Sequence, residues 1–540
     1  MKSKKLKKKI TINSSFISML IIVISNILSI IYVIPFHAIV GDSGGALYGY
    51  AYTLYSLFMS IAFGGIPLAI NRIVNEYQTL GYHGAKKRVL IISKKIALLL
   101  GIVCFLILVL LAPLFAKAIL GNLVGINSLK DITLVIRIMS IAVLVTPILN
   151  VYKGYFEGHR LVNEVSFSKH LEQVINYMVL IIGSFFALKV FKVSLSGIVS
   201  VALTGIIVGV IGAYIYLIDK KLKNKKKFDE KIRNVNEPII SNKMIFRKIV
   251  LYAVPFIVID LLKSLYGYID MVTVVKGLVK YARFSAVDAE TIMGMLSLWG
   301  AKFNLIMLSM AMGVVVKLIP SLSQSIAKKD NKEICRKVNR GLSITLFIML
   351  PVTIAISFLA EPIWSLFYGA SKYGASVLAY YIFVGLLMGL CAVSIAILQA
   401  MKDYKTIFAS LTIGVLIKML MNTSMIYTFH QYGMPGYYGV ITASILAYLV
   451  SFIICLVSLY LKNKVEYEET VKNFTDILCG CMLMVVVLFL MKFMIPVVSE
   501  VRIINLFILL IYLVIGAFIY LLFVGKMGAI KNIFGNNKKK

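Results

Sequence analysis

The sequence predicts an all-α polytopic membrane protein, on the basis of its composition and the length of its apolar runs. Hydrophobic residues make up 60% of the 540-residue chain, charged residues make up 15%, and the mean hydropathy is +0.91. Soluble domains contain about 45–50% apolar and about 25% charged residues. A helix that crosses a bilayer needs about 20 apolar residues, and many runs in this chain reach that length. The runs do not alternate in polarity, which excludes the strands of a membrane β-barrel.

Apolar runs between charged, glycine and proline breaks give about fourteen predicted spans. Their approximate limits are 13–36, 46–71, 91–116, 131–152, 165–188, 194–218, 248–276, 290–319, 341–360, 374–400, 406–429, 437–461, 474–497 and 503–525. A long charged segment follows the sixth span. The prediction therefore divides the chain into an N-terminal lobe (1–218, spans 1–6), a basic cytoplasmic linker (219–247), a C-terminal lobe (248–461, spans 7–12), and two extra spans with a basic cytoplasmic tail (462–540).

The distribution of Lys and Arg predicts that both termini are cytoplasmic. With the N-terminus inside, the inner segments hold 42 of these residues and the outer segments hold 10. Cytoplasmic loops of membrane proteins carry such an excess. The formal net charge of +34 is therefore explained by topology and by contact with anionic lipid headgroups, and does not indicate nucleic-acid binding.

The two halves of the chain resemble each other. At an offset of 249 residues, Ser60–Gly64 aligns with Ser309–Gly313, and Pro113 aligns with Pro362. At an offset of 246, Glu172 is the counterpart of Lys418. Six spans in each half give both halves the same orientation, which predicts a pseudo-two-fold parallel repeat about an axis along the membrane normal. Two such lobes suit transport by alternating access.

Ionisable residues inside the spans are candidates for substrate contact, because a charge in the bilayer is costly and usually faces a cavity or a partner. In the seventh span Asp260, Lys263 and Asp270 share one helical face. Lys302 in the eighth span and Lys418 in the eleventh have no acidic neighbour on their own turn, which favours contact with an anion.

Other polar residues complete the predicted substrate-binding set, and several have a purely structural alternative. The remaining members are Arg137, Glu172, Asn26 and Tyr52. Arg137 could instead extend to the outer headgroups, and Asp260 could simply neutralise Lys263. Hydroxyl and aromatic side chains in the first two spans suit a sugar, but such serines also pack helices and such tyrosines also form interfacial belts.

The sequence does not predict an enzyme. It contains no Walker A loop, no G-x-S-x-G motif and no cluster of His, Cys or carboxylate residues with metal-ligand spacing. No cofactor is therefore expected. A transporter without an ATP site must use an ion gradient such as sodium or protons, the membrane potential, or downhill flow of its substrate.

Several segments resemble the MOP flippase superfamily, and within it the polysaccharide-exporter branch that includes stage V sporulation protein B and the MurJ-type lipid II flippases. The segments that carry this resemblance are TLYSLFMSIAFGGIPLAINRIVNEY (53–77), YKGYFEG (152–158), 252–273, SMAMGVVVKLIPSLSQS (309–325) and ILQAMKDYK (397–405). Each motif is weak alone, but their order and spacing along nearly the whole chain are specific.

The resemblance implies two six-helix lobes around a central cavity lined by spans 1, 2, 7 and 8, with spans 13 and 14 forming a groove for a polyprenyl tail. It implies an undecaprenyl-pyrophosphate-linked saccharide, above all lipid II for peptidoglycan synthesis, moved from the inner to the outer leaflet of a bacterial plasma membrane. Related flippases carry arginines in the cavity part of spans 1 and 2. Here span 1 has none and Arg72 sits at the cytoplasmic end of span 2, so the cationic role falls to Lys263 and Lys302.

Three functions remain open from the sequence. The first is a monomeric flippase for lipid II or another lipid-linked polysaccharide, whose partners are that lipid and the membrane lipids. The second is a cation-coupled multidrug exporter of the same superfamily, for which acidic cavity residues are expected. The third is a membrane scaffold in envelope or spore assembly that transports nothing.

Overall fold

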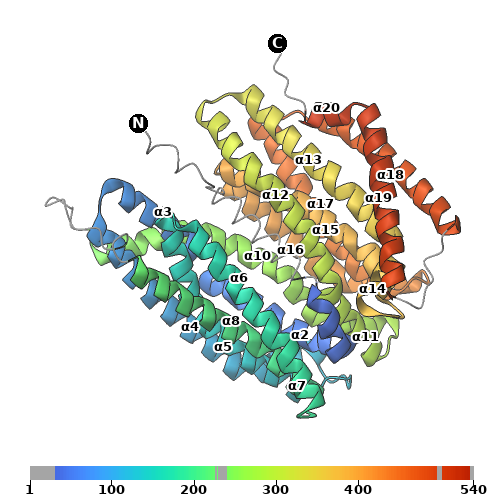
Figure 1. The fold of residues 1–540 in the computed structure, drawn as a ribbon, viewed down its shortest axis with the longest axis horizontal. Helices are drawn as coiled ribbons and strands as arrows, with labels where there is room; N and C mark the ends of the chain where they lie inside the picture. The colour runs from blue at the N-terminus through green and yellow to red at the C-terminus, as the bar shows by residue number, and fades with distance from the viewer. Residues whose placement is uncertain (1–28, 30, 225–227, 229–239, 495–501, 535–540) are drawn as a thin grey trace, which may run out of the picture. The chain divides into compact units, whose positions relative to one another are not determined.

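The protein is an all-α polytopic membrane protein, as the sequence predicts (Figure 1). The computed structural model describes residues 29, 31–224, 228, 240–494 and 502–534. Within these ranges nearly every residue is helical and no strand occurs. Twelve helical segments in the same ranges are long and apolar enough to cross a membrane, and they correspond to predicted spans 2–6 and 8–14. Predicted span 1 lies mostly outside the described residues.

Contacts divide the chain into two compact units, Met1–Tyr268 and Ile269–Lys540. The helical segments of the first unit are α2 (Val33–Phe63), α3 (Ile66–Leu80), α4 (His83–Leu120), α5 (Leu129–Gly158), α6 (Val162–Met178), the π-helical turn η1 (Val179–Gly183), α7 (Ser184–Lys189) and α8 (Leu195–Lys223). Helix α5 is central, because it packs against α2, α3, α4 and α8.

Helix α10 (Asn242–Ala282) covers the seventh predicted span, and the boundary between the two units lies inside it. The lobe boundary expected in the linker 219–247 stays a prediction. Two contacts hold the first half of α10 to α3. The Lys248 ammonium lies 2.6 Å from a carboxylate oxygen of Glu76, and the Arg72 guanidinium lies over the Tyr252 ring, 4.4 Å from its centroid.

The second unit continues with α11 (Ala286–Gly294), η2 (Met295–Trp299), α12 (Gly300–Ala327), α13 (Asn331–Phe358), α14 (Ala360–Tyr368), α15 (Gly374–Ala400), α16 (Tyr404–Gln431), α17 (Gly436–Asn463), α18 (Glu468–Met494), α19 (Arg502–Lys526) and α20 (Ala529–Phe534). Helix α15 packs against α12, α13 and α17, while α18 packs against α13 and α19. The two C-terminal spans attach to the bundle through α13 and α14.

The second predicted span, 46–71, is broken in the structure between α2 and α3. Gly65 adopts a left-handed conformation with φ of 77°, and Pro67 lies in the first turn of the next helix. A Cβ atom on Gly65 would approach the Ala253 carbonyl oxygen to 2.7 Å, so glycine allows α10 to come close to the break. The sequence prediction runs through this point because the residues on both sides of the glycine pair are apolar.

Asp403 joins the start of α16 to the end of α17. Its carboxylate caps α16 by accepting a hydrogen bond from the Thr406 N–H, at 3.3 Å, and it pairs with the Lys462 ammonium at 2.6 Å. Burial raises the pKa of Asp403, but the hydrogen bonds from Lys462 and Thr406 outweigh it, and the net pKa is lowered. The ionised form therefore stabilises the fold above the unfolded-state pKa of about 3.9, and this contribution is lost as the pH falls below it.

We expect Asp403→Ala to lower the free energy of unfolding at pH 7 by about 0.5–2 kcal/mol, because α16 loses its N-cap. Lys462→Ala is the matched control, because it keeps the Asp403 cap while it removes the half-exposed ion pair, which contributes about 0–1 kcal/mol, and the hydrogen bond from Lys462 to the Thr406 hydroxyl. Thermal unfolding of the detergent-solubilised protein measures both. The gap between wild type and Asp403→Ala should narrow as the pH is lowered towards 3.5. A gap that widens on acidification would contradict the account.

Candidate functional site: a polar cavity in the first unit

A polar cavity of about 470 Å³ lies within the first unit, beside the break between α2 and α3. Its wall comes from α2, α3, α5 and α10. The polar side chains that line it are Tyr52, Tyr55, Ser56, Ser60, Asn150, Asp260, Lys263 and Ser264. Hydroxyl, amide and charged groups at this density are unusual inside a membrane bundle, which makes the cavity the candidate site for a polar substrate.

Lys263 provides the cation of this cavity. Its side chain is exposed, while Asp260, one turn earlier on α10, is partly buried. No ion pair of 4.0 Å or less joins these two groups, so the structure does not show the neutralising pair that their spacing allows. The start of α3 lies at the cavity wall through Gly65 and Leu68. The C-terminal end of α2, at Phe63 and Gly64, lies in the same wall, so the two helix ends oppose each other and the Lys263 ammonium is the group of the cavity that favours an anion.

Tyr52 offers an exposed aromatic face to the same cavity. Its side chain is 47% exposed although its neighbours Tyr48 and Leu54 are buried. The Tyr52 ring lies 6.1 Å from the Tyr48 ring and 5.9 Å from the Tyr55 ring, measured between centroids. The Tyr55 hydroxyl donates to the Thr146 hydroxyl at 3.2 Å. These contacts hold the Tyr52 ring in place, so its exposed part can stack on a ring of a bound molecule.

Two serine hydroxyls connect α2 and α10 at the cavity. The Ser60 and Ser264 oxygens are 2.7 Å apart, so one hydroxyl donates to the other, and the hydroxyl that accepts donates in turn to a carbonyl on its own helix, that of Ser56 or of Asp260. The shared hydrogen bond fixes Lys263, the residue before Ser264, relative to the α2 face that carries Tyr52. The sequence analysis did not single out Ser60, Ser264 or Asn150 as site residues. Their only signal was polarity within apolar spans, which many helix-packing serines share.

Asp270 and Lys418 are brought together, but away from this cavity. The Lys418 ammonium lies 2.6 Å from Asp270 Oδ1, and the Lys418 side chain is 0% exposed. The sequence favoured contact between Lys418 and an anionic substrate because no acidic residue lies on its own turn. The structure shows an acidic partner from another helix, α10, and the Lys418 side chain is buried with it. Asp270 is equally committed to this pair.

The remaining predicted residues lie elsewhere. Glu172 on α6 pairs with Lys153 on α5 at 2.5 Å, so it too is neutralised by a neighbouring helix. Arg137 is exposed on α5 and does not line the cavity, which agrees with its structural alternative at the headgroups. Lys302 is half-buried on α12, in the second unit. Asn26 lies outside the described residues.

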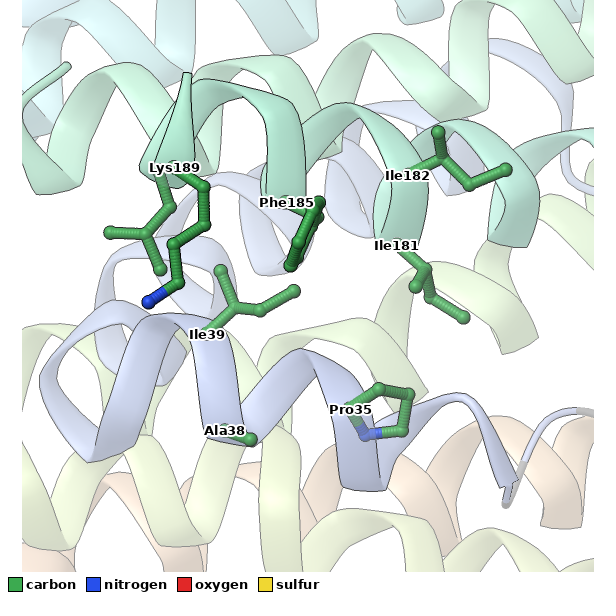
Figure 2. A pocket seen from close by; sticks show the side chains of 8 residues that line it. Pro35, Ala38, Ile39, Ile181, Ile182, Phe185 and Lys189 are labelled. Carbon is green, nitrogen blue, oxygen red and sulfur yellow. The ribbon is translucent and has the colours of Figure 1, made fainter. Parts of the chain in front are cut away.

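A second cavity in the first unit, of about 460 Å³, has a different character (Figure 2). It is lined by Pro35, Ala38 and Ile39 of α2 and by apolar residues of η1 and α7, with Lys189 as its one charged member. Figure 2 shows Phe185 and Lys189 projecting towards the α2 segment that carries Ile39. An apolar wall suits lipid chains and offers little to a polar headgroup, so we assign the candidate site to the polar cavity.

A membrane-spanning helical bundle with a polar, cation-bearing cavity has the architecture of a membrane transporter. The family model described as polysaccharide biosynthesis protein matches residues 12–324, and the model described as MatE matches residues 284–423. The chain is 31% identical over 456 residues to the lipid II flippase MurJ of Bacillus subtilis (strain 168), covering 83% of this chain and 82% of that protein. This protein therefore belongs to the polysaccharide biosynthesis protein family of the MOP flippase superfamily.

More distant relatives agree with this assignment. Stage V sporulation protein B of Bacillus subtilis is 23% identical over 392 residues, which is 70% of each chain. The solved structure of the lipid II flippase MurJ in an inward closed conformation matches 95% of this chain and 98% of its own, with a TM-score of 0.67 and 17% identity. An inward-facing MATE family multidrug transporter of the MOP superfamily matches 83% of this chain and 99% of its own, with a TM-score of 0.63 and 12% identity. These two structures share the fold. The family is one of transporters, so the chain is not an enzyme.

Thiol accessibility tests whether the polar cavity contains water. In a variant that lacks the six native cysteines, Ser56→Cys places a thiol on the cavity wall, and Ile70→Cys places one on α3 where the native side chain is 0% exposed. We expect a hydrophilic methanethiosulfonate reagent to modify the thiol at position 56 and to leave the thiol at position 70 unmodified. Equal protection of both thiols, measured by mass spectrometry, would mean that the cavity is closed to water.

Proposed function

We propose that this protein is a flippase that moves lipid II, the undecaprenyl-pyrophosphate-linked precursor of peptidoglycan, from the inner to the outer leaflet by alternating access. The observation that carries the proposal is the 31% identity over 83% of the chain to a protein named lipid II flippase. The polar cavity supports it, because its chemistry matches both parts of such a headgroup.

The diphosphate part of the headgroup matches Lys263. A pyrophosphate that leaves water needs cations and N–H donors, and Coulomb attraction is stronger in a cavity of low dielectric constant than in bulk water. Lys263 offers three N–H donors on a flexible stem. Asp260 lies one turn earlier on α10, beside Gly64, so its carboxylate would repel phosphates from that end of the cavity and leave the Lys263 side to them.

The saccharide part matches the α2 side of the cavity. The exposed face of Tyr52 can stack on the apolar face of a sugar ring, and Ser56, Ser60 and Asn150 can exchange hydrogen bonds with sugar hydroxyl and amide groups. The hydrocarbon tail does not need the cavity because it is already soluble in the bilayer. A flippase of this kind only has to shelter the polar headgroup, whose transfer through hydrocarbon without partners is strongly unfavourable.

We propose that the membrane potential drives transport. Moving one elementary charge across the membrane is worth about 2.3 kcal/mol per 100 mV, and a potential that is negative inside favours outward movement of an anionic headgroup. We further propose that the protein acts as a monomer in a bacterial plasma membrane with both termini in the cytoplasm. The excess of Lys and Arg in the predicted inner segments supports this orientation.

A multidrug exporter is the second candidate, because the MatE family model matches residues 284–423 and because the polar cavity contains the carboxylate of Asp260. Cationic drugs would use Asp260, whereas an anionic headgroup would use Lys263. The two candidates therefore predict opposite consequences for charge-removing substitutions one turn apart on the same helix.

Substitution of Lys263 tests the flippase proposal. In a strain that depends on this protein for growth, we expect Lys263→Ala to reduce the outer-leaflet appearance of lipid II by about 10- to 150-fold, because a charge-assisted hydrogen bond contributes about 1.5–3 kcal/mol. Lys263→Arg should keep most of the activity, and Lys130→Ala, at an exposed lysine of α5 outside the cavity, should keep all of it. Protein abundance in the membrane is measured alongside.

Full activity of Lys263→Ala at normal abundance would contradict a role for this cation. The multidrug candidate is supported instead if Asp260→Asn abolishes drug efflux while lipid II remains accessible in the outer leaflet of cells that lack the protein.

A further inference from the structure

The buried ion pair of the second unit surrounds an ammonium group with oxygen atoms. The Lys418 Nζ lies 2.6 Å from Asp270 Oδ1, donates to the Ser444 hydroxyl at 2.5 Å and donates to the Val440 carbonyl oxygen at 3.2 Å. Lys418 is on α16, Asp270 is on α10, and the other two acceptors are on α17. An ammonium has three N–H donors, so this group has one acceptor for each, and its side chain is 0% exposed.

These three oxygens form a cage of the kind that a small cation occupies. A carboxylate, a hydroxyl and a main-chain carbonyl are hard oxygen ligands, which bind alkali and alkaline-earth cations in preference to soft metals. The Ser444 hydroxyl also donates to the Val440 carbonyl oxygen at 3.2 Å, so the two α17 acceptors are held next to each other by their own helix. These two oxygen ligands are therefore positioned by α17 itself, and not by Lys418.

A second layer of contacts fixes the carboxylate. The Asn422 side-chain N–H₂ donates to Asp270 Oδ1 at 3.0 Å and to the Thr273 hydroxyl at 2.7 Å. Asn422 lies one turn after Lys418 on α16 and is itself buried, and its Oδ1 atom has no hydrogen-bond partner in the described part of the chain. Removal of the ammonium would leave the Asp270 carboxylate uncompensated, which is strongly destabilising in a buried site.

We propose that Lys418 is a tethered cation, which occupies an oxygen cage that would otherwise bind a free monovalent cation. Because the ammonium is part of the chain, it holds α10, α16 and α17 together whichever cations are dissolved in the solvent. The protein consequently needs no dissolved sodium or potassium at this position. As an extension that rests on the proposed flippase function, transport is then not coupled to binding of an alkali cation in this cage.

Removal of the lysine side chain tests the cage. We compare the thermal unfolding midpoints of purified full-length wild type, Lys418→Ala and Lys418→Met in sodium, potassium, ammonium and choline chlorides at one ionic strength. The wild-type midpoint should be the same in all four salts. The Lys418→Ala midpoint should be lower in choline and should rise saturably, by about 3 °C or more, with at least one of the three small cations. Lys418→Met fills the space with an apolar chain and should not respond.

The double variant Lys418→Ala, Asp270→Asn is the control for the ligand set, because it lacks the negative charge of the cage. Its midpoint should be the same in choline and in the small cations. Two results would overturn the proposal. One is a Lys418→Ala midpoint that is the same in choline and in all three small cations. The other is a wild-type midpoint that one of these cations raises as much as it raises the Lys418→Ala midpoint. These measurements need no substrate, so their failure is separate from failure of the flippase proposal.

Wild-type protein offers a test that does not depend on whether Lys418→Ala folds. Lipid II flipping in vesicles should proceed at an unchanged rate when choline replaces sodium and potassium on both sides at a fixed membrane potential. A loss of tenfold or more on this replacement would contradict the extension to transport. Flipping that is absent in every salt would instead contradict the flippase proposal, and would leave the unfolding measurements to decide on the cage.

Discussion

The cost of an isolated charge in the hydrocarbon region governs the arrangement of this protein. Each ionisable side chain in a span must find an opposite charge, reach the headgroups or face water. The described spans use all three solutions. Asp270 pairs with Lys418 and Glu172 pairs with Lys153, Arg137 is exposed on α5, and Lys263 is exposed to a polar cavity. A charge that is buried with an opposite charge holds the bundle together. A charge that faces a polar cavity can contact a substrate.

Lys263 and Lys418 show how the same side chain serves both purposes. Lys263 stands on α10 beside hydroxyl and aromatic groups of α2, and its ammonium has no ion-pair partner within the described residues. Lys418 has three oxygen acceptors and no exposed surface. A cation that must attract and then release a diphosphate has to remain accessible. A cation that fixes three helices has to be buried, since burial and complete hydrogen bonding are what make its removal costly.

The sequence predicts much of this fold, because a bilayer imposes a simple length and polarity rule on each span. Spans 2–6 and 8–14 match helical segments of the structure, and span 7 matches α10. The break at Gly65 was missed, since apolar residues flank it and local hydropathy does not change there. Lys263, Asp260 and Tyr52, which the sequence analysis named as candidates, line one cavity, and their contact with a substrate stays a prediction. The pairing of Lys418 could not be predicted, because Asp270 belongs to a helix far away in the sequence. The division at 219–247 and the parallel repeat remain predictions.

The central claim is that the polar cavity receives the headgroup of a lipid-linked saccharide. Photo-crosslinking tests this contact directly. With p-benzoylphenylalanine in place of Tyr52, the account predicts an ultraviolet-dependent covalent adduct with radiolabelled lipid II, which excess unlabelled lipid II abolishes. The same amino acid in place of Phe185, in the apolar cavity, should give no adduct with the headgroup. Headgroup adducts at position 185 and none at position 52, with both variants active, would contradict the account.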